Sequence, residues 1–409
     1  MQQRPSNPRG VEMLVIKAGR AFDGERQLPG GAVVFVDEGR IAGVEPATAP
    51  LPAGWPVAEF PTATVLPGLI DTHVHLSGDG ADGALNRLPH YRDDELAAVI
   101  AAALRRHLAV GVTTVRDLGD RHWCVLEWRD RVVRGCAEVI GPTILASGPP
   151  ITSVGGHCWQ MGGEAGGATQ LRAAIRERVE RRADIVKIMA SGGATTAGTD
   201  LMGSQFTGDE LRLMVDAAHA AGLPVTVHAH GLAAVEQAVD AGVDGIEHCT
   251  CLTPSGMDLR ESLLASLAER RIAVCPTLGM VTDPVRSAGM RAALGQVGLT
   301  WDLVVQQMGN VHRAGVRLVS GSDGGVMAAK PHGLLPAAVA DLVTAGVPAC
   351  QALASATSVA AQECGLGTRK GRLCVGQDAD LLLVDGDPLS DIHALTRTVA
   401  VMAGGQWCR

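Results

Sequence analysis

The pattern of apolar and polar residues divides the chain into a middle region and two similar end regions. Near the start, short apolar runs alternate with turn residues, at 13–16, 31–36 and 41–44. Two more such runs, 380–384 and 399–402, close the chain. Runs of this kind predict short antiparallel strands. We expect the two ends to pair as one small β-sandwich domain, formed by residues 1–65 plus 368–409.

The middle region, residues 66–367, follows a different pattern, in which short β-rich runs alternate with stretches of helical spacing. Strands are predicted at 65–75, 113–118, 143–147, 185–190, 225–230, 245–248, 273–276 and 317–320. Helices are predicted at 93–109, 169–182, 207–221, 231–241, 258–269 and 299–314. Regular alternation of this kind predicts βα units around a parallel sheet. Eight strands fit an α/β fold of the (β/α)8 TIM-barrel type, whose active site lies at the carboxyl ends of the strands.

Composition narrows the class of protein. Of the 409 residues 46% are hydrophobic and 19% are charged, and the formal net charge is −8. This charge gives no reason to expect a nucleic-acid or membrane-surface partner, and no apolar run reaches the ~20 residues of a membrane span. The ten cysteines include no Cys-x-x-Cys pair, and no apolar signal segment follows Met1. We therefore expect a cytoplasmic protein with reduced thiols.

The first chemical signal is the segment 66–75, an apolar run that ends in His73-Val74-His75. On a strand, alternate side chains share one face, so Asp71, His73 and His75 point the same way. Two imidazoles at a strand end can begin a metal site, with Asp71 orienting one of them. The alternative is that polar residues simply close the strand.

Later predicted strands repeat this signal at their ends. Lys187 lies in an apolar run, His228 and His230 share a strand face, and His248 and Asp323 follow two further strands. Each residue alone is consistent with a capped strand end or a core histidine, and Lys187 with a lysine that reaches solvent or pairs with a carboxylate. Together, imidazole and carboxylate suit two divalent cations. A lysine ammonium is not a ligand, whereas its carbamate could bridge two metals.

These motifs resemble those of the amidohydrolase superfamily, in the branch around Xaa-Pro dipeptidases, amino-acyl carboxypeptidases and imidazolonepropionase-related hydrolases. The resemblance covers nearly the whole chain and rests on the segments 67–75, 113–117, 155–157, 186–193, 228–231, 246–248, 321–323 and 376–381. These motifs are specific for the superfamily and only weakly specific for the substrate.

The resemblance implies a role for each strand-end residue. His73 and His75 would bind the more buried metal, an N6-carboxylated Lys187 would bridge two ions, and His228 and His248 would hold the second. Asp323 would bind the first metal and act as general acid/base on the water that bridges them. We expect zinc, with manganese or iron as alternatives.

Two further histidines are assigned to the substrate. His157, in a glycine-rich loop after the third strand, would polarise the scissile carbonyl, with residues 159–161 as pocket walls. His230 would contact substrate or oxyanion, with a ligand role in place of His228 as the alternative. Dipeptidases of this branch often carry tyrosine at this position, so histidine puts recognition of a peptide C-terminus in doubt. Segment 280–300 is a candidate lid.

The predicted function is hydrolysis of a C–N amide bond by a metal-bridging hydroxide, in a dipeptide or N-acyl amino acid. Alternatives on the same site are a cyclic amide, a lactone or another ester. Deamination of a heterocycle by a one-metal site is disfavoured by Lys187, and a non-catalytic scaffold is disfavoured by the full ligand set. We expect a small-molecule substrate and a homo-oligomer.

Overall fold

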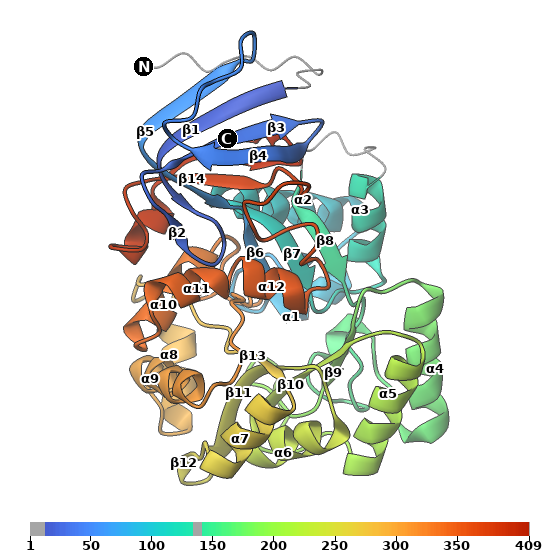
Figure 1. Ribbon diagram of the computed structural model, residues 1–409. Helices are drawn as coiled ribbons and strands as arrows, with labels where there is room; N and C mark the ends of the chain where they lie inside the picture. Colours follow the sequence, from blue (N-terminus) through green and yellow to red (C-terminus); the bar gives the residue numbers. More distant parts are fainter. Residues whose placement is uncertain (1–12, 134–140, 409) are drawn as a thin grey trace.

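The computed structural model describes residues 13–133 and 141–408, and residues 1–12 of the predicted β domain lie outside these ranges. A sheet occupies one end of the molecule, and a larger part in which helices surround strands occupies the other (Figure 1). The boundaries drawn from the sequence, 1–65 plus 368–409 and 66–367, stay predictions.

One continuous eight-stranded sheet contains strands from both chain ends. Its strands are β1 (Met13–Phe22), β2 (Gln27–Leu28), β3 (Ala32–Asp37), β4 (Arg40–Pro46), β5 (Val57–Pro67), β14 (Leu381–Asp385), β15 (Thr398–Ala403) and β16 (Gln406–Trp407). Their order is β16-β15-β14-β5-β1-β3-β4, with β2 paired to β1. β14 runs antiparallel to β5, with Leu66 opposite Leu382. The first and last parts of the described chain are therefore hydrogen-bonded side by side.

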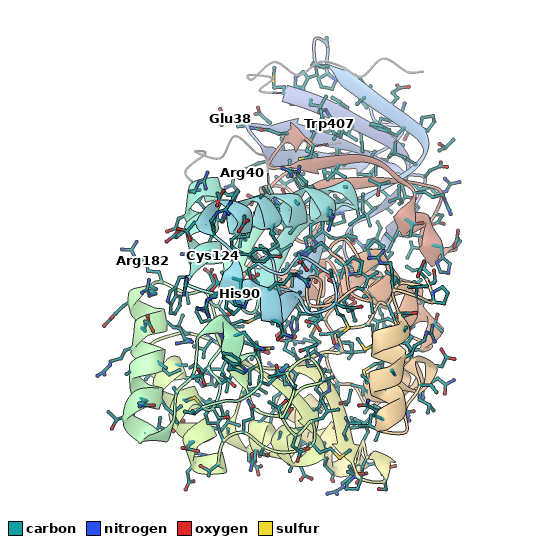
Figure 2. The ribbon with its side chains drawn as sticks, turned by 180° about the vertical axis from the view of Figure 1, so that it is seen from behind. Glu38, Arg40, His90, Cys124, Arg182 and Trp407 are labelled. Atoms are coloured by element: carbon teal, nitrogen blue, oxygen red, sulfur yellow. The ribbon has the colours of Figure 1, made fainter. Side chains whose placement is uncertain are left out.

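Apolar residues from both ends pack on this sheet. Ile16, Val34 and Val65 bury their side chains against Leu381 and Met402. In the view from behind, Arg40 and Trp407 both lie on this sheet, far from His90 in the larger part (Figure 2). Since these contacts join residues more than 300 positions apart, neither end can complete this small core alone.

The predicted strand 65–75 is wrong in one respect, because the chain forms two strands there. β5 ends at Pro67 within the sheet of the chain ends, and β6 (Leu69–Val74) begins a second sheet. Gly68 lies at the break and donates its N–H to Asp380 O at 2.8 Å. A Cβ at Gly68 would lie 2.1 Å from the Thr113 hydroxyl, so this crossing requires glycine.

The strands of the middle region pair in sequence order. β6, β7 (Val112–Asp117) and β8 (Thr143–Ala146) form one parallel sheet. β9 (Val186–Met189), β10 (Val225–Gly231), β11 (Gly245–Thr253) and β13 (Ala273–Cys275) form another, and β12 (Gly256–Met257) turns back on β11. Backbone contacts link these sheets: Asp184 N–H donates to Ala146 O, and Ile151 bridges Ile188.

The predicted strand 317–320 is not formed. Only an isolated bridge between Leu318 and Val274 is present. Beyond it Ser320 donates its N–H to Ser355 O, away from the neighbouring strand, while its carbonyl accepts the N–H of Thr72 at 3.1 Å. These backbone contacts are too few to form a strand. The segment nevertheless lies between β13 and β6 and links the last of these strands to the first.

The six predicted helices are present within a few residues: α2 (Asp93–Ala109), α4 (Gly167–Glu180), α5 (Gly208–Ala220), α6 (Leu232–Ala241), α7 (Glu261–Glu269) and α9 (Trp301–Arg313). Unpredicted α-helices are α1 (Ala84–Arg87), α3 (Cys124–Val133), α8 (Ala288–Gln296), α10 (Leu335–Thr344), α11 (Ala349–Ala354) and α12 (Ser358–Glu363). Short 3-10 turns are η1 (Leu88–His90), η2 (Trp159–Met161) and η3 (Ile392–Thr396). Among the described residues no helix combines the length and the apolar character needed to cross a membrane.

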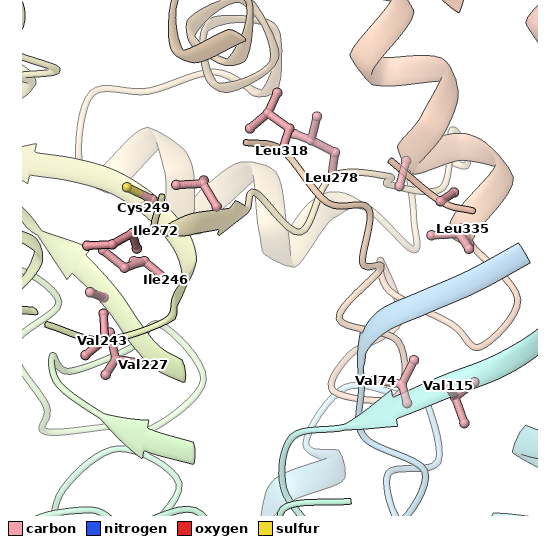
Figure 3. Packing of buried hydrophobic residues seen from close by; sticks show 14 of the residues in the cluster. Val74, Val115, Val227, Val243, Ile246, Cys249, Ile272, Leu278, Leu318 and Leu335 are labelled. Carbon is pink, nitrogen blue, oxygen red and sulfur yellow. The ribbon is translucent and has the colours of Figure 1, made fainter. Parts of the chain in front are cut away.

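Aliphatic residues fill the core between strands and helices. Val227 and Ile246 of β10 and β11 cluster with Val243 and Ile272 (Figure 3). Apolar packing therefore holds these strands in place.

Candidate active site

One cavity of about 130 Å³ collects all the predicted site residues. Its walls include His73, His75, His157, Lys187, His228, His230, His248 and Asp323. They come from β6, β9, β10 and β11, from His75 directly after β6, and from the segments after β8 and residue 320. A site for one water needs only about 10–15 Å³ on this scale, so the cavity has room for a small ligand.

His73, His75 and Asp323 form a first candidate metal cluster. The Nε2 atoms of both histidines lie 3.3 Å from the same carboxylate oxygen of Asp323 and 3.3 Å from each other. Burial disfavours the charged form of Asp323, but His73 and His75 beside it hold its pKa well below the usual range. Two nitrogens and one anionic oxygen that converge in this way suit zinc or a similar cation.

Both histidines of this cluster are held through their other nitrogen. His73 Nδ1 lies 2.7 Å from Glu247 Oε2, and His75 Nδ1 lies 3.1 Å from Gly119 O. Each ring therefore presents Nε2 to the cavity, as in metal sites where an outer partner fixes the ring. Burial and the charge of Lys187 lower the pKa of His73 to about 4, which favours the neutral imidazole that binds metals.

His228, His230 and His248 form a second candidate cluster, with potential ligand atoms within 4.8 Å of one another. His228 Nε2 contacts Gly192 O at 3.0 Å, which leaves Nδ1 free to bind a metal. His248 Nδ1 lies 2.7 Å from the Thr277 hydroxyl and His230 Nδ1 lies 2.9 Å from the Thr250 hydroxyl, which leaves Nε2 in both rings. His230 also stacks on His248, with centroids 4.5 Å apart. The geometry therefore keeps both predicted roles of His230 open.

Lys187 lies between these groups and has an unusual environment. Its side chain is fully buried, and Nζ has no hydrogen-bond partner among the described residues. Burial lowers its pKa. An unpaired ammonium in such a place is costly. A carbamate at Nζ would replace it with oxygens that can bind cations, so the residues present fit a pair of divalent ions.

His157 lies against the second cluster, with its ring centroid 4.5 Å from that of His228. Its Nδ1 lies 2.9 Å from the Thr196 hydroxyl, which belongs to the segment after β9. The ring also packs on Gly193, where a Cβ would lie 2.4 Å from Nε2. Burial and the nearby His230 lower the pKa of His157 to about 3.

The predicted pocket walls Trp159, Gln160 and Met161 do not line the cavity. Trp159 is 44% exposed, Gln160 donates to Asn86 at 3.2 Å, and Met161 lies near Gly119. The reason is local: Cys158 adopts a left-handed backbone and η2 turns the three side chains away. Of this stretch, only His157 and Cys158 are among the described residues that line the cavity.

Asp71 acts chiefly on the loop of Asp323 and less on a histidine. It accepts the N–H of Ser322 at 2.9 Å and its hydroxyl at 2.6 Å, and the backbone N–H of His73 more weakly at 3.3 Å. Asp323 has φ = 56°, a left-handed conformation that costs about 1–2 kcal/mol outside glycine. The Asp71–Ser322 pair therefore helps to hold Asp323 in a backbone shape that it would not choose alone.

Left-handed backbones also occur elsewhere around the cavity. His248 and Thr277 have φ values of 68° and 49°. Such outliers concentrate where the surrounding structure fixes a functional side chain. Thr277 holds His248, so both residues of this contact have a strained backbone. This is consistent with a site in which the position of the His248 ring is closely fixed.

Several cavity residues escaped prediction. An apolar wall comes from α8, α9 and the turn between them, through Met290, Ala293, Leu294, Val297, Leu299, Trp301 and Val304. This wall includes the segment predicted as a lid. Lys330 also lines the cavity, and Glu247 supports His73 from behind. Two signals were present in the sequence: the wall residues from 290 to 299 belong to the predicted lid, and Glu247 directly precedes His248 on a predicted strand.

Comparison with known proteins gives consistent matches over most of the chain. The sequence profile of the Amidohydrolase family matches residues 64–408. An ochratoxinase from Aspergillus niger is 25% identical, covering 98% of this chain and 88% of that protein. An imidazolonepropionase from Salinispora arenicola is 26% identical, over 60% of this chain and 63% of that protein. The crystal structure of a Xaa-Pro dipeptidase with bound methionine in the active site superposes with a TM-score of 0.85 at 27% identity, covering 97% and 99% of the two chains.

Proposed function

The chain belongs to the amidohydrolase family, and from this premise we propose that it is a binuclear metal-dependent hydrolase of a C–N amide bond. Its substrate class is a dipeptide or an N-acyl amino acid. The observation that carries the proposal is the meeting of two ligand clusters and an unpaired buried lysine in one cavity. The proposed architecture is a (β/α)8 barrel, residues 66–367, with a small β domain from residues 1–65 and 368–409.

Each metal site has its own proposed residues. His73, His75 and Asp323 would hold one ion, His228 and His248 would hold the other, and an N6-carboxylated Lys187 would supply oxygen ligands to both. Divalent ions bound here would polarise a carbonyl and lower the pKa of water toward neutrality. Glu247 holds His73 and Thr277 holds His248, in each case through Nδ1. These contacts keep the Nε2 atoms of both rings aimed at the cavity.

Asp323 is the proposed proton carrier. Its carboxylate is largely buried and beside two imidazoles, which hold its pKa well below the usual range, so it is in the ionised form that a general base requires. It takes the proton from the attacking water and delivers it to the leaving amine. The Asp71–Ser322 contacts hold it in place for both transfers.

His157 and His230 are the proposed substrate contacts. His157 reaches the cavity over Gly193 and donates from Nε2 to the scissile carbonyl oxygen, while its Nδ1 is held by Thr196. His230 is fixed by Thr250 and offers Nε2 to the substrate. The apolar wall from α8 and α9 borders the same cavity and limits the access of water to it.

The substrate class rests on the cavity and on the similar proteins together. The cavity is small and mostly apolar beyond the ligand clusters. The Xaa-Pro dipeptidase structure holds methionine in its active site, which is the kind of product that an N-acyl amino acid would release. The ochratoxinase match extends over nearly the whole chain, so ochratoxin is among the compounds to be tested.

A substrate screen with a metal-site control tests the proposal. Zinc-loaded protein, prepared with bicarbonate, is assayed against dipeptides and N-acyl amino acids for release of the free amino acid. Lys187→Ala is expected to lose hydrolysis and the second equivalent of zinc, whereas Lys17→Ala on β1 keeps both. If only cyclic amides or lactones are hydrolysed, these compounds take the place of dipeptides and N-acyl amino acids as the substrate class. Unchanged activity in Lys187→Ala would refute the binuclear site.

A further inference from the structure

Lys330 is a buried lysine at the edge of the cavity that the proposed mechanism does not use. Its side chain is among the largest fully buried ones, and it lines the cavity together with Thr277, Trp301 and Met327. It lies in the segment after Asp323, where its backbone N–H donates to Met327 O at 2.9 Å and its carbonyl accepts the N–H of Gly325 at 2.8 Å. The backbone therefore fixes Lys330 beside the metal ligands.

The hydrogen-bond partners of the Lys330 ammonium are neutral, and the charges of Asp323 and Asp341 act on it only from beyond ion-pair distance. Nζ donates to Thr277 O at 2.5 Å and to Leu278 O at 3.2 Å, and it lies 5.0 Å from the centre of the Trp301 ring. No carboxylate of the described chain forms an ion pair with it. In contrast, the buried Lys370 lies 2.5 Å from Asp380 and 3.2 Å from Asp378.

These contacts leave the Lys330 ammonium without an ion-pair partner among the described residues and with one N–H donor still available. An ammonium has three N–H donors, and two are engaged by the carbonyls of residues 277 and 278. Burying a cation without an anionic partner is unfavourable, and an anion placed beside it would relieve that cost. Since Lys330 borders the cavity, a bound ligand can supply this anion.

The rest of the cavity indicates the character of that ligand. The residues that line it in the described chain include two lysines, Lys187 and Lys330, and no arginine. Lys187 belongs to the proposed metal bridge, so Lys330 is the cation left for a substrate anion. The same cavity is lined by the apolar wall of α8 and α9, in which Met290 and Leu294 lie beside Trp301, the ring that Lys330 Nζ contacts.

We propose that Lys330 binds the α-carboxylate of the substrate, and that the wall of α8 and α9 receives an apolar side chain of the same amino acid. This inference rests on the proposed function and narrows its substrate class to N-acyl amino acids with a free carboxylate and an apolar side chain. Lys330 acts on substrate selection, since it does not touch the scissile bond.

A purely structural role for Lys330 makes a different prediction. Its partner Thr277 also holds His248 through the hydroxyl, so loss of Lys330 could disturb the second metal cluster. Such a disturbance would slow every substrate to a similar degree. Binding of a carboxylate would affect only substrates that carry one.

A matched pair of substrates separates these roles. N-acetyl-L-methionine carries the carboxylate and a flexible apolar side chain, and N-acetyl-L-methioninol has the same amide with a neutral hydroxymethyl group. The zinc-loaded protein is expected to prefer the acid about tenfold to hundredfold in kcat/KM, the usual effect of one hydrogen bond to a charged group. Lys330→Gln, which can still donate to the two carbonyls, is expected to abolish the preference through a higher KM for the acid.

Two further variants keep the test decisive. Lys330→Met should behave like Lys330→Gln if charge is what matters, and Leu294→Ala in the apolar wall should slow both compounds alike. An equal loss for acid and alcohol in Lys330→Gln, or no preference in the unaltered protein, would overturn the inference.

Calorimetric titration with the same two compounds distinguishes this inference from the proposed function. If neither is hydrolysed but the acid alone binds, and Lys330→Gln loses that binding, the carboxylate site stands and the hydrolase assignment fails. If neither compound binds, the inference is overturned regardless of which reaction the enzyme catalyses.

Discussion

Replacing Glu247 by glutamine tests whether a buried carboxylate organises the first metal cluster. Glu247 is almost fully buried and accepts from Thr226 at 2.6 Å, while His73 Nδ1 and Arg116 Nη2 lie 2.7 Å and 3.3 Å away. Burial alone would favour its neutral form, but His73, Lys187 and Arg116 hold its pKa well below the usual range. Glu247→Gln keeps the shape of the side chain and removes the negative charge that pairs with the buried Arg116 guanidinium.

The expected magnitude follows from these partners. Breaking a buried ion pair by neutralising one member costs about 3–5 kcal/mol of unfolding free energy, because the other charge stays buried. Loss of the outer partner of a ligand histidine lowers metal affinity by about 10–100-fold. Denaturant unfolding of the metal-free protein measures the first effect, and zinc competition with a chelator measures the second.

The same substitution at Glu236 provides the control. Glu236 pairs with Arg260 on the surface, where both side chains are half exposed, so Glu236→Gln should change stability by less than about 1 kcal/mol. If Glu247→Gln costs no more than this control and binds zinc equally well, the carboxylate does not organise His73 and the reasoning is refuted.

Two further predictions concern the substrate side of the cavity and its acid sensitivity. Gly193→Ala would place a Cβ 2.4 Å from His157 Nε2, so activity should fall about a hundredfold because the ring is displaced, while the zinc content stays unchanged. Gly208→Ala, where the added Cβ meets open space, is the control. Equal activity of the two variants would contradict the role of His157. His332, whose Nε2 lies 2.8 Å from Gly78 O, has its pKa lowered by burial from 6.5 to about 4. The unfolded chain therefore takes up the proton first as the pH falls, and about 3 kcal/mol of stability should be lost between pH 6.5 and 4. His332→Gln should flatten this part of the pH–stability curve, and an identical curve would show that His332 does not titrate in this way.

The sequence predicted what depends on strand geometry. Alternation along a strand placed His73 and His75 on one face, and the shared direction of parallel strands brought Lys187, His228 and His248 to one cavity. These relations require only local periodicity and a fold class. For the same reason helices such as α2 and α5, with clear apolar spacing, were found nearly to the residue.

Features that depend on partners far along the chain were not predictable. The strand break at Gly68 arises because Asp380 and Thr113 meet it, and segment 317–320 loses its strand ladder to Ser355. Lys330 has no local signal, since its neighbours in sequence give no reason to bury it. Its environment exists only once Thr277 and Trp301 are brought beside it.

The pairing of β5 with β14 has a consequence for how the chain is made. β5 leads directly into β6 and on to His73 and His75, but its partner Leu382 is synthesised 316 residues after Leu66. At a bacterial-like elongation rate of about 5–20 residues per second, roughly 15–60 s separate the two. Throughout that interval one edge of β5 lacks its native partner, and an unpaired edge invites association with other chains. High contact order of this kind slows folding. The arrangement therefore predicts that recovery after dilution from denaturant will be slow and will fall steeply as protein concentration rises.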